Sequence, residues 1–332
     1  MVQRVLIAGG YGAVGGTAAR YLRRLAPDLD IILAGRSPEA GAALAREIGA
    51  RTLTLDVTDP TAALADLGPV DLIVATLQDR GDALIHAALA QGAAHIGITK
   101  VVEETGPAVF AALHAPPRRP IVLAGHWAAG VLILAARPAL AEFARVDAVA
   151  MAVLFDAADA VGPMSTADAE AFSPRALLRR AGQWAWVDGG EHVRTLRLGS
   201  GSEAAVQPLA TLDVPSLAAI TGAPDIRFDF GMGDSLGTRA GGRASHEGLI
   251  EIEGVLRSGQ PVRRRVLVSD PKGVGHMTAL GALVVAERVL GLDGQKLPAG
   301  GLALPETLVS PAAAIARFEQ HGLRITTETE EA

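Results

Sequence analysis

The stretch "VLIAGGYGAVGG", residues 5–16, decides how the first half of this chain is interpreted. Five glycines come directly after an apolar run, and three of them have the spacing G-x-G-x-x-G between an expected strand and an expected helix. Such a turn lets a pyrophosphate approach the backbone and leaves free amides at the helix N-terminus to bind it. We therefore expect dinucleotide contacts from Gly10, Tyr11, Gly12, Ala13, Val14 and Gly15.

Short apolar runs alternate with helical patterns beyond this turn. The strands are expected to begin at Arg4, Asp30, Arg51, Asp71, His95, Pro120 and Asp147. Strands that are apolar almost throughout and separated by helices indicate right-handed βαβ units and a parallel sheet covered on both faces. The predicted fold class is α/β, a doubly wound parallel sheet of the Rossmann type.

The pattern changes after about residue 156, where strand-like alternation and Gly-rich turns dominate. We expect an inserted α+β, mainly antiparallel domain over residues 129–274, which binds substrate and dimerises. Residues 1–128 and 275–325 are expected to form the dinucleotide-binding domain, with C-terminal helices that return to it. Within the insertion, "SPRALLRRAG" (173–182) predicts a helix capped by Ser173 with Pro174 at its first position. The acidic end "TETEEA" is expected to be frayed.

Composition excludes several classes of function. The chain has 332 residues, a formal net charge of −6 and no cysteine, which argues against nucleic acid as partner and excludes thiolate metal sites and cysteine nucleophiles. The basic runs Arg118-Arg119 and Arg263–Arg265 are interpreted as solvated. The eight histidines lack metal-binding spacing, so no metal is expected. Since the longest apolar block is shorter than about 18 residues, and no signal peptide is evident, we expect a soluble, cytoplasmic protein without membrane partner.

The end of the second strand indicates which dinucleotide is bound. NAD sites place Asp or Glu there to bind the ribose 2′-hydroxyl, whereas this chain reads "ILAGRS", with Gly35, Arg36 and Ser37. A guanidinium and a hydroxyl can bind a 2′-phosphate, which a carboxylate would repel. We therefore predict NADP (NADPH). Further cofactor contacts are expected at other strand ends, from Asp56, Val57, Ala75, Thr76, Leu77 and Thr99.

The same glycines also fit G-x-x-G-x-x-G through Gly9, the spacing of short-chain and epimerase-type dehydrogenases. Those enzymes need a Tyr-x-x-x-Lys pair for proton transfer. The only tyrosines are Tyr11 and Tyr21, and neither has lysine four residues later. That class is excluded.

The motifs at both ends of the chain resemble the saccharopine dehydrogenase and saccharopine reductase-like family. The resemblance rests on the glycine turn, "ILAGRS", "DLIVATLQD" and "ALAQGAAHIGIT", and on the closing "GLALPETLVSPAAAIARFEQHGLRI", where Pro305, Glu306 and Gly322 match; it covers roughly residues 1–135 and 275–325. It implies a nicotinamide oxidoreductase that transfers hydride to or from an imine or amino-acid adduct bearing a carboxylate, and a homodimer. Where the family often has Gly-x-x-Pro-Gly, this chain has His126-Trp127, so its substrate is expected to differ.

Candidate catalytic residues follow the fifth and sixth strands, because open parallel sheets bind ligands at the carboxyl ends of their strands. Lys100 and His126 lie there, and an ordinary histidine pKa suits acid catalysis near neutrality. Cations in Gly-rich loops of the second domain are expected to bind the substrate carboxylate: Arg239, Arg243, His246 and Lys272. Two alternatives stay open, a carbonyl reductase on the same scaffold and a non-catalytic NADPH-binding regulator.

Overall fold

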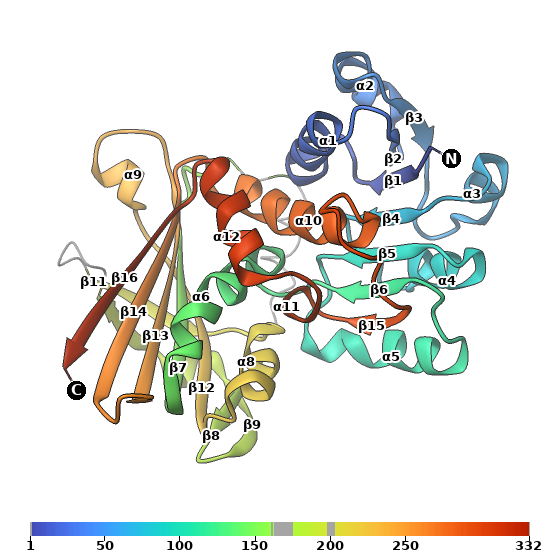
Figure 1. Cartoon of the computed structure of the whole chain (residues 1–332). Coiled ribbons are helices and arrows are strands. Elements are labelled where there is room, and N and C mark those ends of the chain that lie inside the picture. The colour runs from blue at the N-terminus through green and yellow to red at the C-terminus, as the bar shows by residue number, and fades with distance from the viewer. Residues whose placement is uncertain (1, 161, 163–174, 198–202, 332) are drawn as a thin grey trace. The chain divides into compact units, whose positions relative to one another are not determined.

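The computed structural model describes residues 2–160, 162, 175–197 and 203–331 (Figure 1). Contacts within the chain divide it into two units. The first unit comprises Met1–Gly125 and Thr278–Val309, and the second comprises His126–Met277 and Ser310–Ala332. No helix among the described residues is long and apolar enough to cross a membrane.

The first unit is built on a seven-stranded sheet in the order β15-β6-β5-β4-β1-β2-β3, with every pair of neighbours parallel. Five of these strands are buried along most of their length, which explains their almost wholly apolar sequences. The order reverses between β1 and β4, which is the position where doubly wound sheets bind ligands. The strands are β1 (Arg4–Ala8), β2 (Asp30–Gly35), β3 (Arg51–Thr54), β4 (Leu72–Ala75), β5 (Ala94–Gly97), β6 (Pro120–Leu123) and β15 (Gly301–Ala303).

Helices connect these strands, as the alternating pattern predicts. They are α1 (Ala13–Leu25), η1 (Pro38–Gly41), α2 (Ala42–Ile48), α3 (Thr61–Leu67), α4 (Ala83–Gln91), η2 (Val102–Glu104), α5 (Thr105–His114) and α11 (Pro305–Leu308). The long helix α10 (Val274–Leu290) begins in the second unit and continues into the first. The predicted doubly wound Rossmann sheet is confirmed.

The second unit contains a nine-stranded sheet in which β10-β11-β12-β7-β13-β14-β16 form the main path and β8 and β9 branch from β12. Its pairs are antiparallel except for β12 and β7, so the expected mainly antiparallel sheet is confirmed. Its strands are β7 (Phe143–Phe155), β8 (Arg175–Arg180), β9 (Gln183–Asp188), β10 (Arg194–Arg197), β11 (Glu203–Pro208), β12 (Asp225–Met232), β13 (His246–Leu256), β14 (Pro261–Asp270) and β16 (Arg324–Glu331). Its helices are η3 (Trp127–Gly130), α6 (Val131–Ala141), η4 (Gly189–His192), α8 (Asp213–Thr221), α9 (Leu236–Arg239) and α12 (Pro311–Gln320).

The helix predicted over residues 173–182 is wrong. Residues 175–180 form strand β8, which pairs with β9, and the expected cap residues Ser173 and Pro174 lie outside the described residues. Ala176, Leu177 and Leu178 are all buried, which a fully covered strand achieves as well as a helix. The short apolar run is compatible with a helix or a strand, and pairing with β9 makes it a strand.

The acidic C-terminal segment is also ordered rather than frayed. It forms β16, whose Thr329 and Glu328 lie opposite Arg264 and Arg265 of β14, so the basic run predicted to be solvated faces an acidic strand. An ion pair of 3.6 Å joins Arg265 to Glu330.

Helix α12 packs on α6, and with β16 it belongs to the second unit, although residues up to 325 were expected in the first domain. Strand β7 lies in the second sheet, between β12 and β13.

Candidate functional site

The glycine turn between β1 and α1 packs tightly against itself. A Cβ on Gly15 would lie 2.4 Å from the carbonyl oxygen of Gly9, and a Cβ on Gly10 would lie 2.6 Å from that of Ile7. At Gly12, the N-cap of α1, a Cβ would meet only the Gly9 oxygen, at 3.3 Å, and no side chain caps the helix. The turn thus has an uncapped helix N-terminus whose first residues, Gly12 and Ala13, are exposed, at the reversal point of the sheet.

Hydroxyl groups fix the neighbouring strand ends. The Thr76 hydroxyl and amide, just after β4, both donate to the Ala8 carbonyl at 2.9 Å, and the Thr99 hydroxyl donates to the Leu77 carbonyl at 3.2 Å. These bonds connect the ends of β1, β4 and β5 into one edge. The predicted contacts Ala75, Thr76, Leu77 and Thr99 therefore lie along the same edge as the glycine turn.

The end of β2 carries an exposed cation. Arg36 and Ser37 are exposed, and the Ser37 amide donates to the Tyr11 hydroxyl at 2.9 Å. Asp56, after β3, accepts hydrogen bonds from the hydroxyl and amide of Thr58; these bonds hold the pKa of Asp56 below its usual value, and the positive charge of Arg36 lowers it further. Arg36, Ser37 and Asp56 therefore gather at one edge, with Val57 half-buried beside them.

Lys100 follows β5 and is buried rather than solvated, with only 8% of its surface exposed. Its Nζ lies 2.5 Å from Oδ1 of Asp82 and 3.4 Å from the carbonyl oxygen of Asp79. The carboxylate of Asp79 accepts the amides of Ala83 and Leu84 at the start of α4, and burial raises the pKa of Asp79. A Cβ on Gly125 would lie 1.6 Å from the Lys100 carbonyl, so the chain after β6 passes directly against the Lys100 backbone.

Sequence reasoning missed both aspartates around Lys100. Asp82 has a left-handed backbone, with φ of 56°, a conformation that costs about 1–3 kcal/mol for a residue other than glycine. The available signal was "LQDRGD", residues 77–82, which places two acids just after the carboxyl end of the fourth strand. The functional edge of the first unit therefore carries a buried lysine and aspartate pair in a strained loop.

His126, in the second unit, is fully buried, and its Nε2 lies 2.8 Å from the Ser216 hydroxyl oxygen. Burial lowers the pKa of His126 to about 3, so the imidazole is neutral at neutral pH. The expectation of an ordinary pKa suited to acid catalysis is therefore wrong. The next residue, Trp127, donates its amide to Asp213 at 2.8 Å.

The two residues after Trp127 have a left-handed backbone conformation, with φ of 50° at Ala128 and 53° at Ala129. This conformation costs about 1–2 kcal/mol at an alanine, so the surrounding contacts must hold this stretch of backbone in place.

The predicted substrate cations divide into two groups. Arg243 and Lys272 are exposed neighbours, because Arg243 donates to the Lys272 carbonyl at 3.3 Å. Arg239, also exposed, ends α9 and donates to the Asp234 carbonyl at 2.9 Å. His246 does not belong to this loop as expected: it is buried at the start of β13, its Nε2 accepts the Trp127 indole N–H at 2.8 Å, and burial lowers its pKa to about 4.

A buried polar network fixes the loop that carries these cations. Oδ2 of Asp156 accepts the amide and hydroxyl of Ser235 at 2.8 Å each and the Thr238 hydroxyl at 2.5 Å, and these hydrogen bonds hold the pKa of Asp156 well below its usual value. Glu247 accepts the Leu236 amide at 3.0 Å and the Ser245 hydroxyl at 2.5 Å. This network is not apparent from the sequence, because Asp156 reaches residues 235–247 only through the pairing of β7 with β13.

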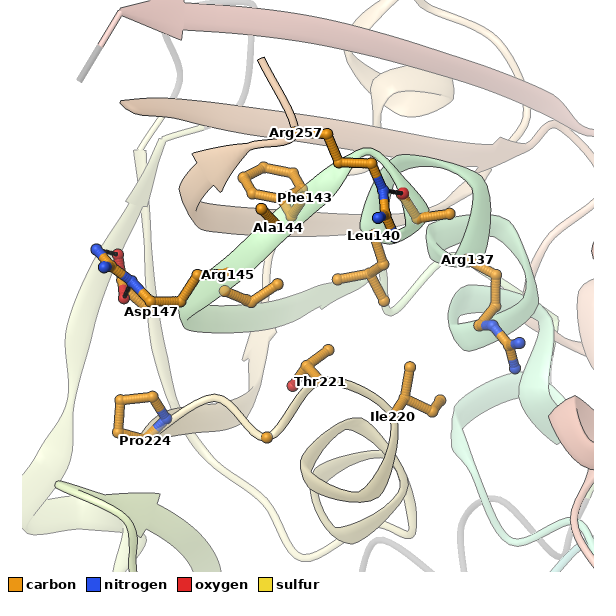
Figure 2. Close-up of a pocket in the computed structure, with 13 residues that line it drawn as sticks. Arg137, Leu140, Phe143, Ala144, Arg145, Asp147, Ile220, Thr221, Pro224 and Arg257 are labelled. Carbon is orange, nitrogen blue, oxygen red and sulfur yellow. Dashed lines mark hydrogen bonds and ion pairs between the residues drawn. The ribbon is translucent and has the colours of Figure 1, made fainter. Parts of the chain in front are cut away.

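A cavity of about 590 Å³ lies in the second unit between the end of α6, the start of β7 and the end of α8 (Figure 2). Its charged groups are engaged: Arg145 pairs with Asp147 at 2.7 Å, and Nε of Arg257 donates to the Ala141 carbonyl at 3.0 Å. Figure 2 shows Arg145 turned toward Asp147. None of the predicted site residues lines this cavity, and we assign it no role.

Buried neutral histidines predict a pH dependence of stability. Burial lowers the pKa of His95 and of His126 to about 3 and that of His246 to about 4, with the charge of Lys100 also acting on His95. Each takes up a proton on unfolding, so the free energy of unfolding decreases as the pH falls from about 6.5 toward these native values, by roughly 1 kcal/mol per pH unit for each histidine. Urea unfolding at pH 7, 6 and 5 measures the slope.

The variant His95→Leu tests the origin of this slope. Neither ring nitrogen of His95 has a hydrogen-bond partner among the described residues, so leucine removes the titration without breaking a polar contact. The slope should decrease by about a third. His86→Gln, on the exposed face of α4, is the control and should leave it unchanged. An unchanged slope in His95→Leu would show that the buried imidazole does not contribute.

No protein-family model and no curated protein matches the chain. Among solved structures, the chain is similar to a saccharopine dehydrogenase (L-Glu forming) from Saccharomyces cerevisiae, with 13% identity, a TM-score of 0.67, and 99% of this chain and 100% of that chain covered. It is also similar to an oxidoreductase from Agrobacterium radiobacter in complex with NAD+, L-tartaric acid and magnesium, with 14% identity, a TM-score of 0.50, and 100% and 98% covered. The chain therefore shares the fold of a saccharopine dehydrogenase over almost its whole length.

Proposed function

We propose that this protein is an NADPH-dependent oxidoreductase that transfers hydride to or from an imine or amino-acid adduct bearing a carboxylate. The observation that carries the proposal is the glycine turn, whose self-packed backbone leaves an uncapped helix N-terminus exposed at Gly12. Pyrophosphates bind at such termini through backbone amides. The shared fold supports the proposal, since the structure from Agrobacterium radiobacter holds NAD+.

The end of β2 supports the phosphorylated dinucleotide. Arg36 and Ser37 are both exposed there, and the strand ends in Gly35 rather than in an aspartate or glutamate. A charge-assisted hydrogen bond contributes about 1.5–3 kcal/mol, so one such bond to a 2′-phosphate gives a preference of about tenfold to a few hundredfold over NADH. The carboxylate of Asp56 is turned toward its own loop, where it accepts hydrogen bonds from the amide and the hydroxyl of Thr58.

A bound nicotinamide dinucleotide would supply or accept the hydride in the proposed reaction. Lys100 holds a charged ammonium at the carboxyl edge of the sheet and supplies the proton that an imine nitrogen needs, while Asp82 orients it. Arg243 and Lys272, with Arg239, are proposed to bind the substrate carboxylate. In this proposal His126 is not the proton donor, because burial lowers its pKa to about 3 and leaves its imidazole neutral at neutral pH.

Stopped-flow fluorescence of bound NADPH tests the reaction. The protein is mixed with 2-oxo acids alone and with 2-oxo acids plus amines or amino acids. Oxidation of NADPH that requires both components is the expected result. Oxidation by the carbonyl compound alone would favour a carbonyl reductase, and binding without oxidation across the panel would favour a non-catalytic regulator.

Arg36→Glu tests the cofactor assignment. The substitution puts a carboxylate where a 2′-phosphate is proposed, so the ratio of the NADPH Kd to the NADH Kd should rise by tenfold to a few hundredfold. Arg46→Glu, an exposed arginine on α2, makes the same charge change and should leave the ratio unaltered. Equal effects of the two variants would contradict the assignment.

We also propose that the protein is a homodimer, as the resemblance implies. One chain has a mass of 34.1 kDa, so light scattering on the eluting protein should give about twice this value. A mass of one chain at micromolar concentration would contradict the proposal.

A further inference from the structure

The side chain of Tyr11 occupies the end of β2. A Cβ on Gly35, the last residue of β2, would lie 2.2 Å from the Tyr11 hydroxyl oxygen, and a Cβ on Gly41 would lie 2.8 Å from Cδ1 of its ring. Two glycines from different elements therefore make room for one aromatic ring. The position where NAD sites carry an acidic side chain is filled instead by a residue of the glycine turn itself.

The hydrogen bonding of Tyr11 leaves its hydroxyl as a donor. The Ser37 amide donates to the hydroxyl oxygen at 2.9 Å, so the oxygen is held as an acceptor and its own proton is available to a further group. A phosphate accepts hydrogen bonds through several oxygens, whereas the ribose 2′-hydroxyl of NAD is ordinarily bound by a carboxylate acceptor. A Tyr11 hydroxyl that donates therefore suits a 2′-phosphate better than the 2′-hydroxyl of NAD.

Three residues with donor groups therefore lie at one strand end. Arg36 contributes a guanidinium, Ser37 a hydroxyl and Tyr11 a second hydroxyl, fixed by an amide and by packing against Gly35 and Gly41. Arg36 and Ser37 are exposed, whereas Tyr11 packs against Gly35 and Gly41 and accepts the Ser37 amide. A preorganised donor loses less conformational entropy on binding than a mobile one.

We propose that Tyr11 is a specificity-determining residue whose hydroxyl binds the 2′-phosphate of the dinucleotide together with Arg36 and Ser37. The inference rests on the proposed function and adds to it a fixed group that distinguishes the phosphorylated cofactor. Because Tyr11 lies between Gly10 and Gly12, the same turn contacts the pyrophosphate through its backbone and the 2′-phosphate through its side chain.

The test is Tyr11→Phe in the full chain, with the Kd of NADPH and of NADH measured by fluorescence titration. Phenylalanine keeps the ring in its slot and removes only the hydroxyl. The NADPH Kd should rise about tenfold, while the NADH Kd changes less than about threefold. The matched control is Tyr21→Phe, the other tyrosine, on α1, which should change neither value. Competition by 2′,5′-ADP and by 5′-AMP provides a second readout, and only the former should weaken in Tyr11→Phe.

Two results would overturn the inference while leaving the proposed function intact. Equal weakening of NADPH and NADH would show that Tyr11 supports the turn rather than distinguishing the phosphate. Unchanged affinity for both would show that its hydroxyl makes no contact with the cofactor. If the unmodified protein binds neither dinucleotide, the proposed function itself fails, and the inference fails with it.

Discussion

Replacing Lys100 with methionine is expected to lower turnover by about 10²–10⁴-fold while the NADPH Kd stays within a small factor of its original value. Methionine approximates the length of the lysine side chain but has no proton to give, and positioned acids contribute rate factors of this size. The ammonium of Lys100 is buried and lies 2.5 Å from Oδ1 of Asp82. Single-turnover oxidation of NADPH, together with fluorescence titration, separates the two effects.

A loss of stability must be distinguished from a loss of catalysis in this variant. Lys100→Met leaves the Asp82 carboxylate buried without its ion-pair partner, which costs about 3–5 kcal/mol of unfolding free energy. The double variant Asp82→Asn, Lys100→Met removes both charges and should recover most of that loss without recovering turnover. Lys296→Met, an exposed lysine, is the control and should change neither quantity. Full turnover in the double variant would show that Lys100 has only a structural role.

Gly12→Ala is expected to weaken NADPH binding by about a hundredfold with little change in the unfolding midpoint. The new Cβ meets only one protein atom, the Gly9 oxygen at 3.3 Å, so the fold accommodates it by a small shift. The methyl group would instead lie where the pyrophosphate must approach the amides of α1, and losing one or two charge-assisted hydrogen bonds there accounts for an effect of this size. Fluorescence titration and thermal unfolding measure the two quantities.

Two further glycine variants separate crowding of the cofactor from damage to the turn. Gly15→Ala places a Cβ 2.4 Å from a backbone oxygen and should reduce both affinity and stability. Gly106→Ala, at a helical glycine with nothing within 4 Å of the new atom, should reduce neither. If Gly12→Ala bound NADPH as tightly as the unmodified protein, the turn would not be a dinucleotide site.

Much of the first unit could be predicted from the sequence because its information is local. Residues of β1, β2, β4, β5 and β6 are apolar almost throughout, and each run lies between helical patterns, so the parallel sheet follows from pattern alone. The spacing of the glycines places the turn at the start of α1 without knowledge of any distant contact. The expected strand-end residues Thr76 and Thr99 likewise lie along one edge.

Predictions for the second unit were less accurate, because there the same residues are compatible with two structures. Three consecutive buried apolar residues in 175–180 fit a strand or a helix, and pairing with β9 decided for the strand. The acidic segment 324–331 has no apolar face that predicts order. It becomes a strand only because β14 presents an unpaired edge with arginines opposite its acids.

The sequence by itself determined the doubly wound sheet, the position of its glycine turn and the missing carboxylate at the end of β2, since each depends on residues close together in the chain. Tertiary structure alone decided that Lys100 is paired with Asp82, that burial keeps His126 neutral, and that Tyr11 fills the space left by Gly35 and Gly41. These outcomes depend on burial and on the approach of distant segments. A side chain's ionisation and partners are set by what surrounds it in space, and periodicity along the chain does not record that.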